Sequence, residues 1–538
     1  MNSQEKYDLI MIGKNQIVDF QKYSSLPLDR IELYQNLVQM RAVYFDNGFR
    51  HPFEVLNKFR HGKYYHEADY PERREMYNIW NLPSLNPYLA ISPLVREGYK
   101  CLVINNLDSD MDIYKENLLA MDKAVVTIST TFILNWNLIG DIIKQTRKIR
   151  SDVTFILGGA FVNDQVTING ISILHKPMKK YKIDYGIHSY NSEGDLLNLM
   201  NCIKGKGSLS SINNLVYFEN DEFCTTKKVW NEPYIQENQE PCWESLDLPT
   251  NTRTVQLRIS SGCSFKCSFC TYPVSAQGYH PAELASLERQ LKAFHDKGIK
   301  NLIFIDDTPN IPPARFKKAL RMISKYNFRW YSFLRVQYVD DELVRLMKES
   351  GCDAVYLGIE SANDEVLKNM NKAAKAKDYS KGIALLNKYN IKSFVAFIVG
   401  FPGETEESIQ DNVNFVLDNN IEFYSLKEFW YSPNAPIANK KDIFKLQGFG
   451  NDWSHNTMNS TIASQKKLEM FEKLEGSLNV DSDSGLWYLA YLRDQGFSWE
   501  EISTFQKTID QMMRNDNKRE FHKNEQLGSI IKNMLNNI

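Results

Sequence analysis

The stretch RISSGCSFKCSFC at residues 258–270 carries three of the eight cysteines of the chain, Cys263, Cys267 and Cys270. Its first three residues also end TVQLRIS (254–260), an apolar run that predicts a buried β-strand. Three thiolates on one loop can hold three irons of a cubane cluster and leave the fourth iron without a protein ligand. An open iron can chelate a substrate, so the spacing favours a catalytic iron–sulfur site. Gly262 suits a backbone that must fold tightly before the first cysteine.

The alternative for these cysteines is a zinc site with His280 or Cys242 as the fourth ligand. Zinc knuckles usually offer paired ligands at both ends of the motif, and the sequence has no second pair. The iron–sulfur interpretation is therefore favoured. The other cysteines are scattered along 538 residues, which is too sparse for a disulfide framework.

The segments that follow the cysteine loop alternate between apolar strands and amphipathic helices. Helices are expected at 282–298, 314–326 and 341–351. Six βα units are fewer than the eight of a closed barrel, so a partial (β/α)6 TIM-like barrel is predicted over residues 246–431. Its chemistry is expected at the carboxyl ends of the strands. The predicted strands are 254–260, 301–306, 330–336, 354–360, 392–400 and 422–430.

A second alternating series lies upstream of the cysteine loop. Strands that are apolar throughout and alternate with helices predict a parallel sheet covered on both faces, here a doubly wound, Rossmann-like α/β domain over residues 1–235. A polar linker is expected at 231–250, and residues 432–538 predict a mostly helical C-terminal domain that caps the barrel. The predicted upstream strands are 7–13, 101–107, 124–130, 153–159 and 184–190.

The composition is that of an ordinary globular protein, with 43% hydrophobic and 24% charged residues. The net charge is −2 without a basic block, so no nucleic-acid partner is expected. No apolar run is long enough to cross a membrane, and the N-terminus lacks the apolar core of a signal peptide. We therefore expect a cytoplasmic protein without a membrane partner.

The cysteine loop resembles that of the radical SAM superfamily, because Cys263, Cys267, Phe269 and Cys270 match its C-x3-C-x-aromatic-C motif. The resemblance implies a 4Fe–4S cluster on the three cysteines and S-adenosylmethionine on the open iron. It places the aromatic ring beside the adenine and makes GIES (358–361) and GFPGET (400–405) cofactor segments. The usual G-G-E after the second strand is absent, and Asp306, Asp307 and Thr308 stand there. The implied S-adenosylmethionine contacts are Phe269, Arg335, Glu360, Ser361, Gly400, Phe401 and Pro402.

The upstream domain resembles the cobalamin-binding domain of one large radical SAM class. Small residues at strand ends carry this likeness, since they allow backbone amides to approach a phosphate or a nucleotide tail. An ordinary doubly wound domain with tight turns is the alternative. The D-x-H-x-x-G motif that supplies a histidine to cobalt is not found. The implied cobalamin contacts are Ser129, Thr130, Thr131, Gly158, Gly159, Ser192, Glu193 and Gly194.

Longer strings, such as FIDDTPNIPPARFKKALRM (304–322) and LMKESGCDAVYLGIES (346–361), resemble the family typified by the phosphinothricin-type P-methyltransferase. The family implies methylcobalamin-dependent methylation of an unactivated carbon or a phosphinate phosphorus, through a 5′-deoxyadenosyl radical. It also implies a peptide or small natural-product substrate and an external flavodoxin- or ferredoxin-type electron donor. A cobalamin-dependent rearrangement or cyclisation without methyl transfer remains the alternative. Asp307, Thr308 and His455 are the expected residues of the substrate pocket.

Overall fold

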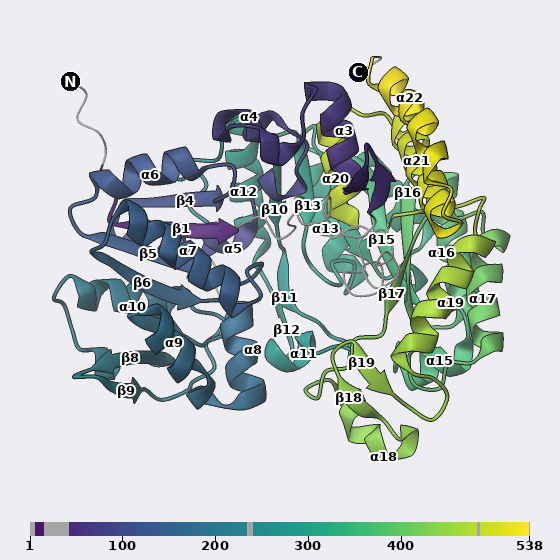
Figure 1. Cartoon of the computed structure of the whole chain (residues 1–538). Helices are drawn as coiled ribbons and strands as arrows, with labels where there is room; N and C mark the ends of the chain where they lie inside the picture. The colour runs from purple at the N-terminus through teal and green to yellow at the C-terminus, as the bar shows by residue number, and fades with distance from the viewer. Residues whose placement is uncertain (1–5, 15–41, 234–239, 481–484, 537–538) are drawn as a thin grey trace. The chain divides into compact units, whose positions relative to one another are not determined.

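The computed structural model describes residues 6–14, 42–233, 240–480 and 485–536, which fall into two compact units. The first unit comprises 6–14, Asp69–Gln256 and Ala282–Lys297. The second comprises 42–68, Leu257–Pro281 and 298–536. Within these ranges, no helix combines the length and apolarity needed to cross a membrane. Figure 1 draws the whole chain.

A seven-stranded sheet in the order β4-β1-β5-β6-β7-β8-β9 forms the centre of the first unit. The first five strands are parallel, and β8 and β9 add an antiparallel edge. In chain order the parallel part reads 2-1-3-4-5, so its topological switch point lies between β1 and β5. The bounds are β1 (Leu9–Lys14), β4 (Cys101–Asn106), β5 (Ala124–Ser129), β6 (Val153–Gly158), β7 (Tyr185–Ile187), β8 (Leu215–Glu219) and β9 (Glu222–Thr225).

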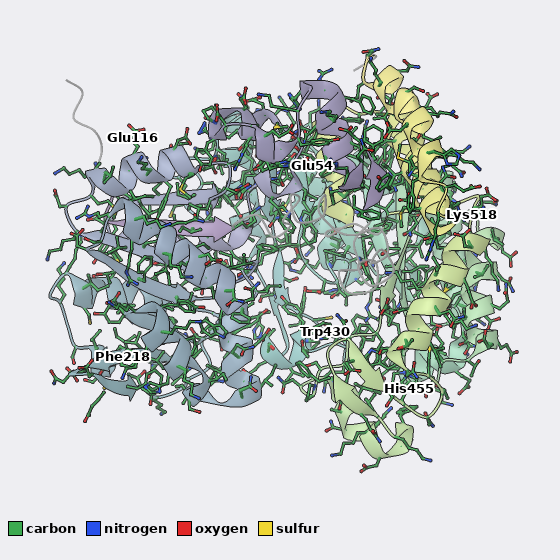
Figure 2. The ribbon with its side chains drawn as sticks, in the orientation of Figure 1. Glu54, Glu116, Phe218, Trp430, His455 and Lys518 are labelled. Carbon is green, nitrogen blue, oxygen red and sulfur yellow. The ribbon has the colours of Figure 1, made fainter. Side chains whose placement is uncertain are left out.

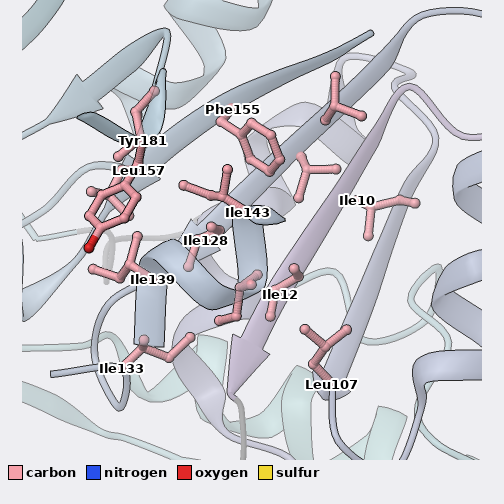
Figure 3. Close-up of a cluster of buried hydrophobic side chains, with 14 of the residues drawn as sticks. Ile10, Ile12, Leu107, Ile128, Ile133, Ile139, Ile143, Phe155, Leu157 and Tyr181 are labelled. Atoms are coloured by element: carbon pink, nitrogen blue, oxygen red, sulfur yellow. The ribbon is translucent and has the colours of Figure 1, made fainter. Parts of the chain in front are cut away.

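Alternate residues of these strands point to one face of the sheet and form a buried core with α6, α7, α8 and α9. Ile10 and Ile12 of β1 lie in this core with Ile128 of β5 and Phe155 of β6 (Figure 3). Helices α5 and α10 contact each other outside this cluster, and α5 also contacts β1 and β4. The helices are α4 (Tyr70–Glu75), α5 (Leu85–Arg96), α6 (Met111–Ala120), α7 (Trp136–Ile149), α8 (Ala160–Asn169), α9 (His175–Tyr181), α10 (Glu193–Ile203) and α12 (Leu284–Asp296).

The second sheet has the order β10-β13-β14-β15-β16-β17-β20. From β13 to β20 every pair is parallel, and helices connect successive strands, as in a barrel that does not close. The strands are β10 (Thr254–Leu257), β13 (Asn301–Phe304), β14 (Arg329–Leu334), β15 (Cys352–Glu360), β16 (Lys392–Val399), β17 (Phe423–Glu428) and β20 (Leu478–Asn479). The connecting helices are α13 (Pro313–Ile323), α14 (Asp341–Glu349), α15 (Asp364–Asn369), α16 (Ala376–Lys388) and α17 (Glu406–Asp418).

Two further parts of the chain belong to the second unit. The hairpin β2 (Val43–Phe45) and β3 (Gly48–Arg50) and helix α3 (Pro52–His61) contact the C-terminal helices. The C-terminal part also holds the two-stranded ribbon β18 (Gln447–Phe449) and β19 (Asp452–Ser454). The C-terminal helices are α18 (Lys441–Phe444), α19 (Ser460–Lys473), α20 (Leu486–Asp494), α21 (Trp499–Asn517) and α22 (Asn524–Leu535).

The predicted α/β class, the six barrel strands and the helical C-terminus are confirmed. The strand predicted at 254–260 is shorter, because β10 ends at Leu257 and Ser260–Gly262 forms a separate strand, β11. At the break, the Asp306 carboxylate accepts the N–H of Ile259 at 3.0 Å in place of a strand partner. The short strand β20 was not expected. The domain bounds 1–235, 246–431 and 432–538 stay a prediction, and residues 234–239 of the expected linker lie outside the described residues.

Candidate active site

A cavity opens at the carboxyl ends of β13, β14 and β15 in the second unit, and all three predicted cluster cysteines line it. Five other predicted site residues line the same cavity: Phe269, Asp307, Thr308, Arg335 and Glu360. Residues as far apart in the chain as Cys263 and Lys372 therefore meet here. The remaining lining residues are Phe265, Tyr272, Pro273, Phe333, Leu334, Tyr356, Gly358 and Lys372.

The cysteine loop begins at a tightly packed glycine. Gly262 has φ +78°, and a Cβ on it would lie 1.7 Å from the carbonyl oxygen of Gly278. This close approach belongs to the antiparallel pairing of β11 with β12 (Tyr279–Pro281). The N–H of Cys263 donates to the same Gly278 oxygen at 3.1 Å. This backbone contact is the reason why a glycine precedes the first cysteine, as the sequence predicts.

The turn after α15 holds the middle of the cysteine loop. The N–H of Ser268 donates to the carbonyl of Met370 at 2.7 Å, and its hydroxyl donates to the carbonyl of Asn369 at 3.0 Å. The Asn371 side chain donates to the carbonyl of Lys266 at 2.7 Å. Backbone groups around the second and third cysteines are thereby fixed before any cofactor binds.

Arg335 lies against the second cysteine. Its Nη2 is 3.0 Å from the Sγ of Cys267, and its Nη1 donates to the carbonyl of Lys372 at 2.7 Å. The guanidinium carbon stands 3.4 Å from the ring centroid of Phe265. Arg335 was predicted to meet the carboxylate of S-adenosylmethionine, and the structure brings it to the cavity and to a cysteine sulfur.

Glu360 and Lys372 form a partly buried ion pair in the cavity wall, with 2.9 Å between Oε1 and Nζ. Glu360 has φ +65°, which is uncommon for a residue other than glycine. The register of β15 against β16 shifts between Gly358 and Glu360, and a Cβ on Gly358 would lie 2.5 Å from the Glu360 carboxylate. The bulge thus turns Glu360 back into the cavity. The Lys372 ammonium lies 5.6 Å from the ring centroid of Phe269.

The two aspartates after β13 have different surroundings. Asp306 is buried and accepts the Ser260 hydroxyl at 2.6 Å, and burial raises its pKa to about 6. It supports the strand that leads into the cysteine loop. Asp307 lines the cavity, where desolvation and the neighbouring Asp306 raise its pKa to about 7. The Thr308 hydroxyl lies 3.6 Å from the Sγ of Cys263.

His455 does not line the cavity; it supports the turn after β16. Its Nε2 lies 2.9 Å from the carbonyl oxygen of Gly400, whose N–H donates to the buried Glu404 carboxylate at 2.5 Å. The His455 ring is stacked on Trp453, with 5.1 Å between centroids, beside the β18–β19 ribbon (Figure 2). Burial lowers the pKa of His455. The residue therefore has a supporting position where a substrate contact was expected.

The other predicted S-adenosylmethionine residues also lie outside the cavity lining. Ser361 is fully buried, and its hydroxyl donates to the Asn412 side chain at 3.4 Å. Phe401 is fully buried too, with its ring 6.4 Å from that of Phe269, edge to face. Pro402 is buried after it. These residues form the support behind the cavity wall.

The ligand geometry separates the two metal interpretations. Within the described ranges, no three His, Cys, Asp or Glu side chains are grouped so as to hold a metal ion together. The proposed fourth zinc ligands have other partners: His280 Nε2 pairs with the carbonyl of Ala276 at 3.0 Å, and Cys242 in the first unit donates to Ser92. The cysteine loop fits an iron–sulfur cluster better than zinc.

In the first unit, two of the predicted cobalamin motifs interlock at the ends of β5 and β6. The N–H of Thr130 donates to the carbonyl of Gly158 at 2.7 Å, and its hydroxyl donates to the same oxygen at 2.9 Å. Gly159 has φ +115°, and a Cβ on it would lie 2.8 Å from the Thr130 nitrogen. Only glycine allows this approach. Ser129 and Thr131 stand on either side, with 3.5 Å between their hydroxyl oxygens.

The third motif follows β7, the next strand of the sheet. Ser192 is the N-cap of α10, Glu193 begins the helix, and the Cβ position of Gly194 has no atom within 4 Å. Asp195 in the first turn accepts hydrogen bonds from Ser189, Asn214 and Asn231. Adjacent strand ends thus offer small side chains and a helix N-terminus, which fits a ligand bearing a phosphate.

Sequence reasoning missed several residues of both sites. Lys372 lines the cavity, but the sequence motifs assigned it no role. Phe333 and Tyr356 could have been identified by the alternation of side chains along β14 and β15. Lys14, at the carboxyl end of β1, is buried, and burial lowers its pKa to about 7. Its position beside the switch point became visible only with the strand order.

Comparison with known proteins identifies the domain that carries the cysteines. Residues 257–416 match the Radical SAM superfamily. The bacteriochlorophyllide d C-12(1)-methyltransferase of Chlorobaculum tepidum is 27% identical over 237 residues, 42% of this chain and 51% of that protein. An uncharacterized methyltransferase of Pyrococcus horikoshii is 26% identical over 357 residues, 62% of this chain and 73% of that protein. The chain spans about half the length of most curated relatives it matches.

Two solved structures share the fold over most of the chain. The radical S-adenosylmethionine methyltransferase TsrM of Kitasatospora setae, with cobalamin and a [4Fe-4S] cluster bound, aligns with a TM-score of 0.52 and 16% identity over 82% of this chain and 77% of its own. The cobalamin-dependent radical enzyme OxsB, with aqua-cobalamin and S-adenosylmethionine bound, aligns with a TM-score of 0.57 and 11% identity over 85% and 82%. The chain therefore carries a radical SAM domain at residues 257–416, within a fold shared with TsrM and OxsB.

Proposed function

We propose that this chain is a cobalamin-dependent radical SAM methyltransferase. The observation that carries the proposal is the cavity in which the three cysteines meet Arg335 and the Glu360–Lys372 ion pair, inside a segment that matches the Radical SAM superfamily. The substrate is a peptide or natural product, methylated at an unactivated carbon or a phosphinate phosphorus. When bound, the cluster supplies one electron to cleave S-adenosylmethionine into methionine and a 5′-deoxyadenosyl radical, and cobalamin supplies the methyl group.

The residues of the cavity bind and orient the cofactors. Cys263, Cys267 and Cys270 hold three irons, and Phe269 packs beside the adenine. Glu360 and Lys372 offer opposite charges for a cofactor that carries both an ammonium and a carboxylate. Because the pair is partly shielded from water, these contacts are screened less than they would be on an exposed surface.

The end of the first unit's sheet is the proposed cobalamin site. The proposed contacts lie at adjacent strand ends. They are the hydroxyl groups of Ser129, Thr130 and Thr131, the glycines 158 and 159, and the turn at 192–194. The close approach of the Thr130 and Gly159 backbones holds these two strand ends together. The TsrM and OxsB structures that share the fold both contain cobalamin, which supports this assignment.

The cavity wall suggests how a substrate is held near the radical. Phe333 and Tyr356 form an apolar surface, with edge-to-face rings whose centroids are 5.0 Å apart. Asp307 faces the same space with an exposed side chain, so its carboxyl group is accessible to a substrate in the cavity. The wall therefore combines an apolar surface, Phe333 and Tyr356, with the carboxyl groups of Asp307 and Glu360, which suits a substrate with both apolar and polar parts.

The test begins with anaerobic purification in the presence of iron, sulfide and cobalamin. The wild-type protein is expected to hold four irons per chain, to bind cobalamin and to form 5′-deoxyadenosine from S-adenosylmethionine with dithionite as reductant. Cys267→Ala should lose the brown colour and deoxyadenosine formation. Cys224→Ala, a cysteine on β9 of the first unit, is the matched control and should keep both.

Product analysis with methyl-labelled S-adenosylmethionine decides between methylation and its alternative. Label in the product supports methyl transfer. An unlabelled product that has been rearranged or cyclised would reassign the enzyme to non-methylating radical chemistry. A Cys267→Ala protein that retains its iron and still forms deoxyadenosine would overturn the cluster assignment.

A further inference from the structure

We propose that Arg335 is a positioning residue that donates a hydrogen bond to the sulfur of Cys267 and thereby raises the reduction potential of the cluster. The inference rests on the proposed function, since it requires a cluster on the cysteine loop. It begins from the contact of 3.0 Å between Arg335 Nη2 and Cys267 Sγ. Nothing in the sequence motif calls for a cation on this sulfur.

The guanidinium is fixed on several sides. Nη1 donates to the carbonyl of Lys372, and the face of the group lies on the Phe265 ring, 3.4 Å from its centroid. The backbone of Arg335 is held by Asn310, which accepts its N–H at 3.1 Å and donates to its carbonyl at 2.9 Å. Only 7% of the residue is exposed. A charged group held this firmly and shielded from water acts as a permanent feature of the site.

The physical effect follows from the charge. Reduction adds one electron, so the reduced cluster is more negative than the oxidised one by a full charge. A nearby cation and a hydrogen bond to a ligating sulfur both favour the more negative state, and hydrogen bonds to sulfur are known determinants of cluster potentials. Burial strengthens the interaction, because solvent does not screen it.

This role differs in its consequences from a contact with the carboxylate of S-adenosylmethionine. A carboxylate contact acts only when the cofactor is bound, and its loss weakens cofactor affinity. A sulfur contact acts on the cluster alone. Lys372 gives an internal comparison, since its ammonium belongs to the same cavity but pairs with Glu360, and the structure gives it no hydrogen bond to a cysteine.

The experiment measures the cluster potential without S-adenosylmethionine. Wild type, Arg335→Lys, Arg335→Gln and Lys372→Gln are reconstituted anaerobically and titrated with dithionite, and the reduced cluster is followed by electron paramagnetic resonance. Arg335→Gln should lower the ratio of reduced to oxidised cluster at a fixed potential at least tenfold, which is 59 mV for a one-electron couple. Arg335→Lys keeps the charge but loses the planar donor and should fall between. Lys372→Gln should change the ratio less than Arg335→Gln.

Two results would overturn the inference. One is an unchanged potential in both Arg335 variants together with weaker S-adenosylmethionine binding by calorimetry, which would assign the arginine to the carboxylate. The other is a shift in Lys372→Gln as large as that in Arg335→Gln, which would leave only a general effect of positive charge. If Arg335→Gln does not retain iron, Arg335→Lys decides alone: a lower ratio of reduced to oxidised cluster than in wild type supports the inference, and an unchanged ratio overturns it. A wild-type protein that holds no cluster would refute the proposed function itself, which keeps the two failures distinct.

Discussion

At the scale of single residues, the backbone at Gly262 sets the geometry of the cysteine loop. Its φ of +78° and the 1.7 Å separation between a hypothetical Cβ and Gly278 O leave no room for a side chain. Gly262→Ala is expected to cost at least about 2 kcal/mol of local stability, from backbone strain and overpacking together. Iron per chain after reconstitution should fall severalfold. Gly476→Ala, where the Cβ position is open, is the control and should reconstitute fully.

His455 makes a second prediction at this scale. The hydrogen bond of its ring to the Gly400 carbonyl and the stacking on Trp453 hold the turn that the resemblance puts beside the adenine. His455→Phe keeps the stacking but removes the hydrogen bond, and should raise the Kd for S-adenosylmethionine roughly 2- to 10-fold, as expected for one net hydrogen bond of about 0.5–1.5 kcal/mol. Iron content should not change.

The conservative variant His455→Gln tests whether the hydrogen bond to Gly400, rather than correct folding in general, is responsible for the affinity. It offers a side-chain N–H donor and should recover part of the lost affinity. Calorimetric titration of the reconstituted proteins gives the comparison. Equal affinity of His455→Phe and wild type would show that the turn holds its shape without the histidine.

At the scale of elements, the end of β15 shows why sequence reasoning found some site residues and not others. The cysteines and Asp307 could be predicted, because their spacing and their place after a strand are visible in the chain. The direction of Glu360 and Ser361 depends on the bulge between Gly358 and Glu360, which turns the first into the cavity and the second toward Asn412. A register shift of this kind leaves no periodic signal in the sequence.

Helix α21 gives a prediction about how elements of the second unit are joined. Asp516 accepts the N–H of Tyr44 in β2 at 2.8 Å and the side-chain amide of Asn524 in α22 at 2.7 Å. Burial raises the pKa of Asp516 to about 7, so the folded protein holds a proton there that the unfolded chain has released above pH 4. The stability from this group is complete at low pH and is lost as pH rises toward 7.

Asp516→Asn removes this titration. The Tm of the variant minus that of wild type should therefore become more positive from pH 5.5 to pH 7.5. A difference in Tm that is the same at every pH does not affect this trend. The corresponding free energy is about 2 kcal/mol, at about 1.4 kcal/mol for each pH unit within the window. Thermal unfolding followed by circular dichroism at several pH values is the measurement. A difference that does not vary with pH would contradict the raised pKa.

At the scale of the whole molecule, both sheets could be predicted because long apolar strands alternate with amphipathic helices. Short strands could not be predicted from the sequence. Strand β20 has two residues, and β2 and β3 have three each, which is too few for a periodic pattern to show. The sequence also gives no sign that residues 42–68 belong to the second unit or that α12 belongs to the first. Such groupings arise from contacts distant in the chain, for which one sequence carries no local pattern.

The two units lead to the final prediction, that the two cofactors can be lost separately. Each proposed site lies within one unit, so damage to one site should leave the other loaded. Gly159→Val places a side chain against the Thr130 nitrogen at a φ of +115°, and should abolish cobalamin binding while iron content and deoxyadenosine formation persist. Cys267→Ala should give the reverse. Both variants should lose methylation of the substrate. Cys224→Ala should bind both cofactors and retain methylation. Visible spectra and iron analysis of the purified proteins test this, and loss of both cofactors from either variant would contradict their independence.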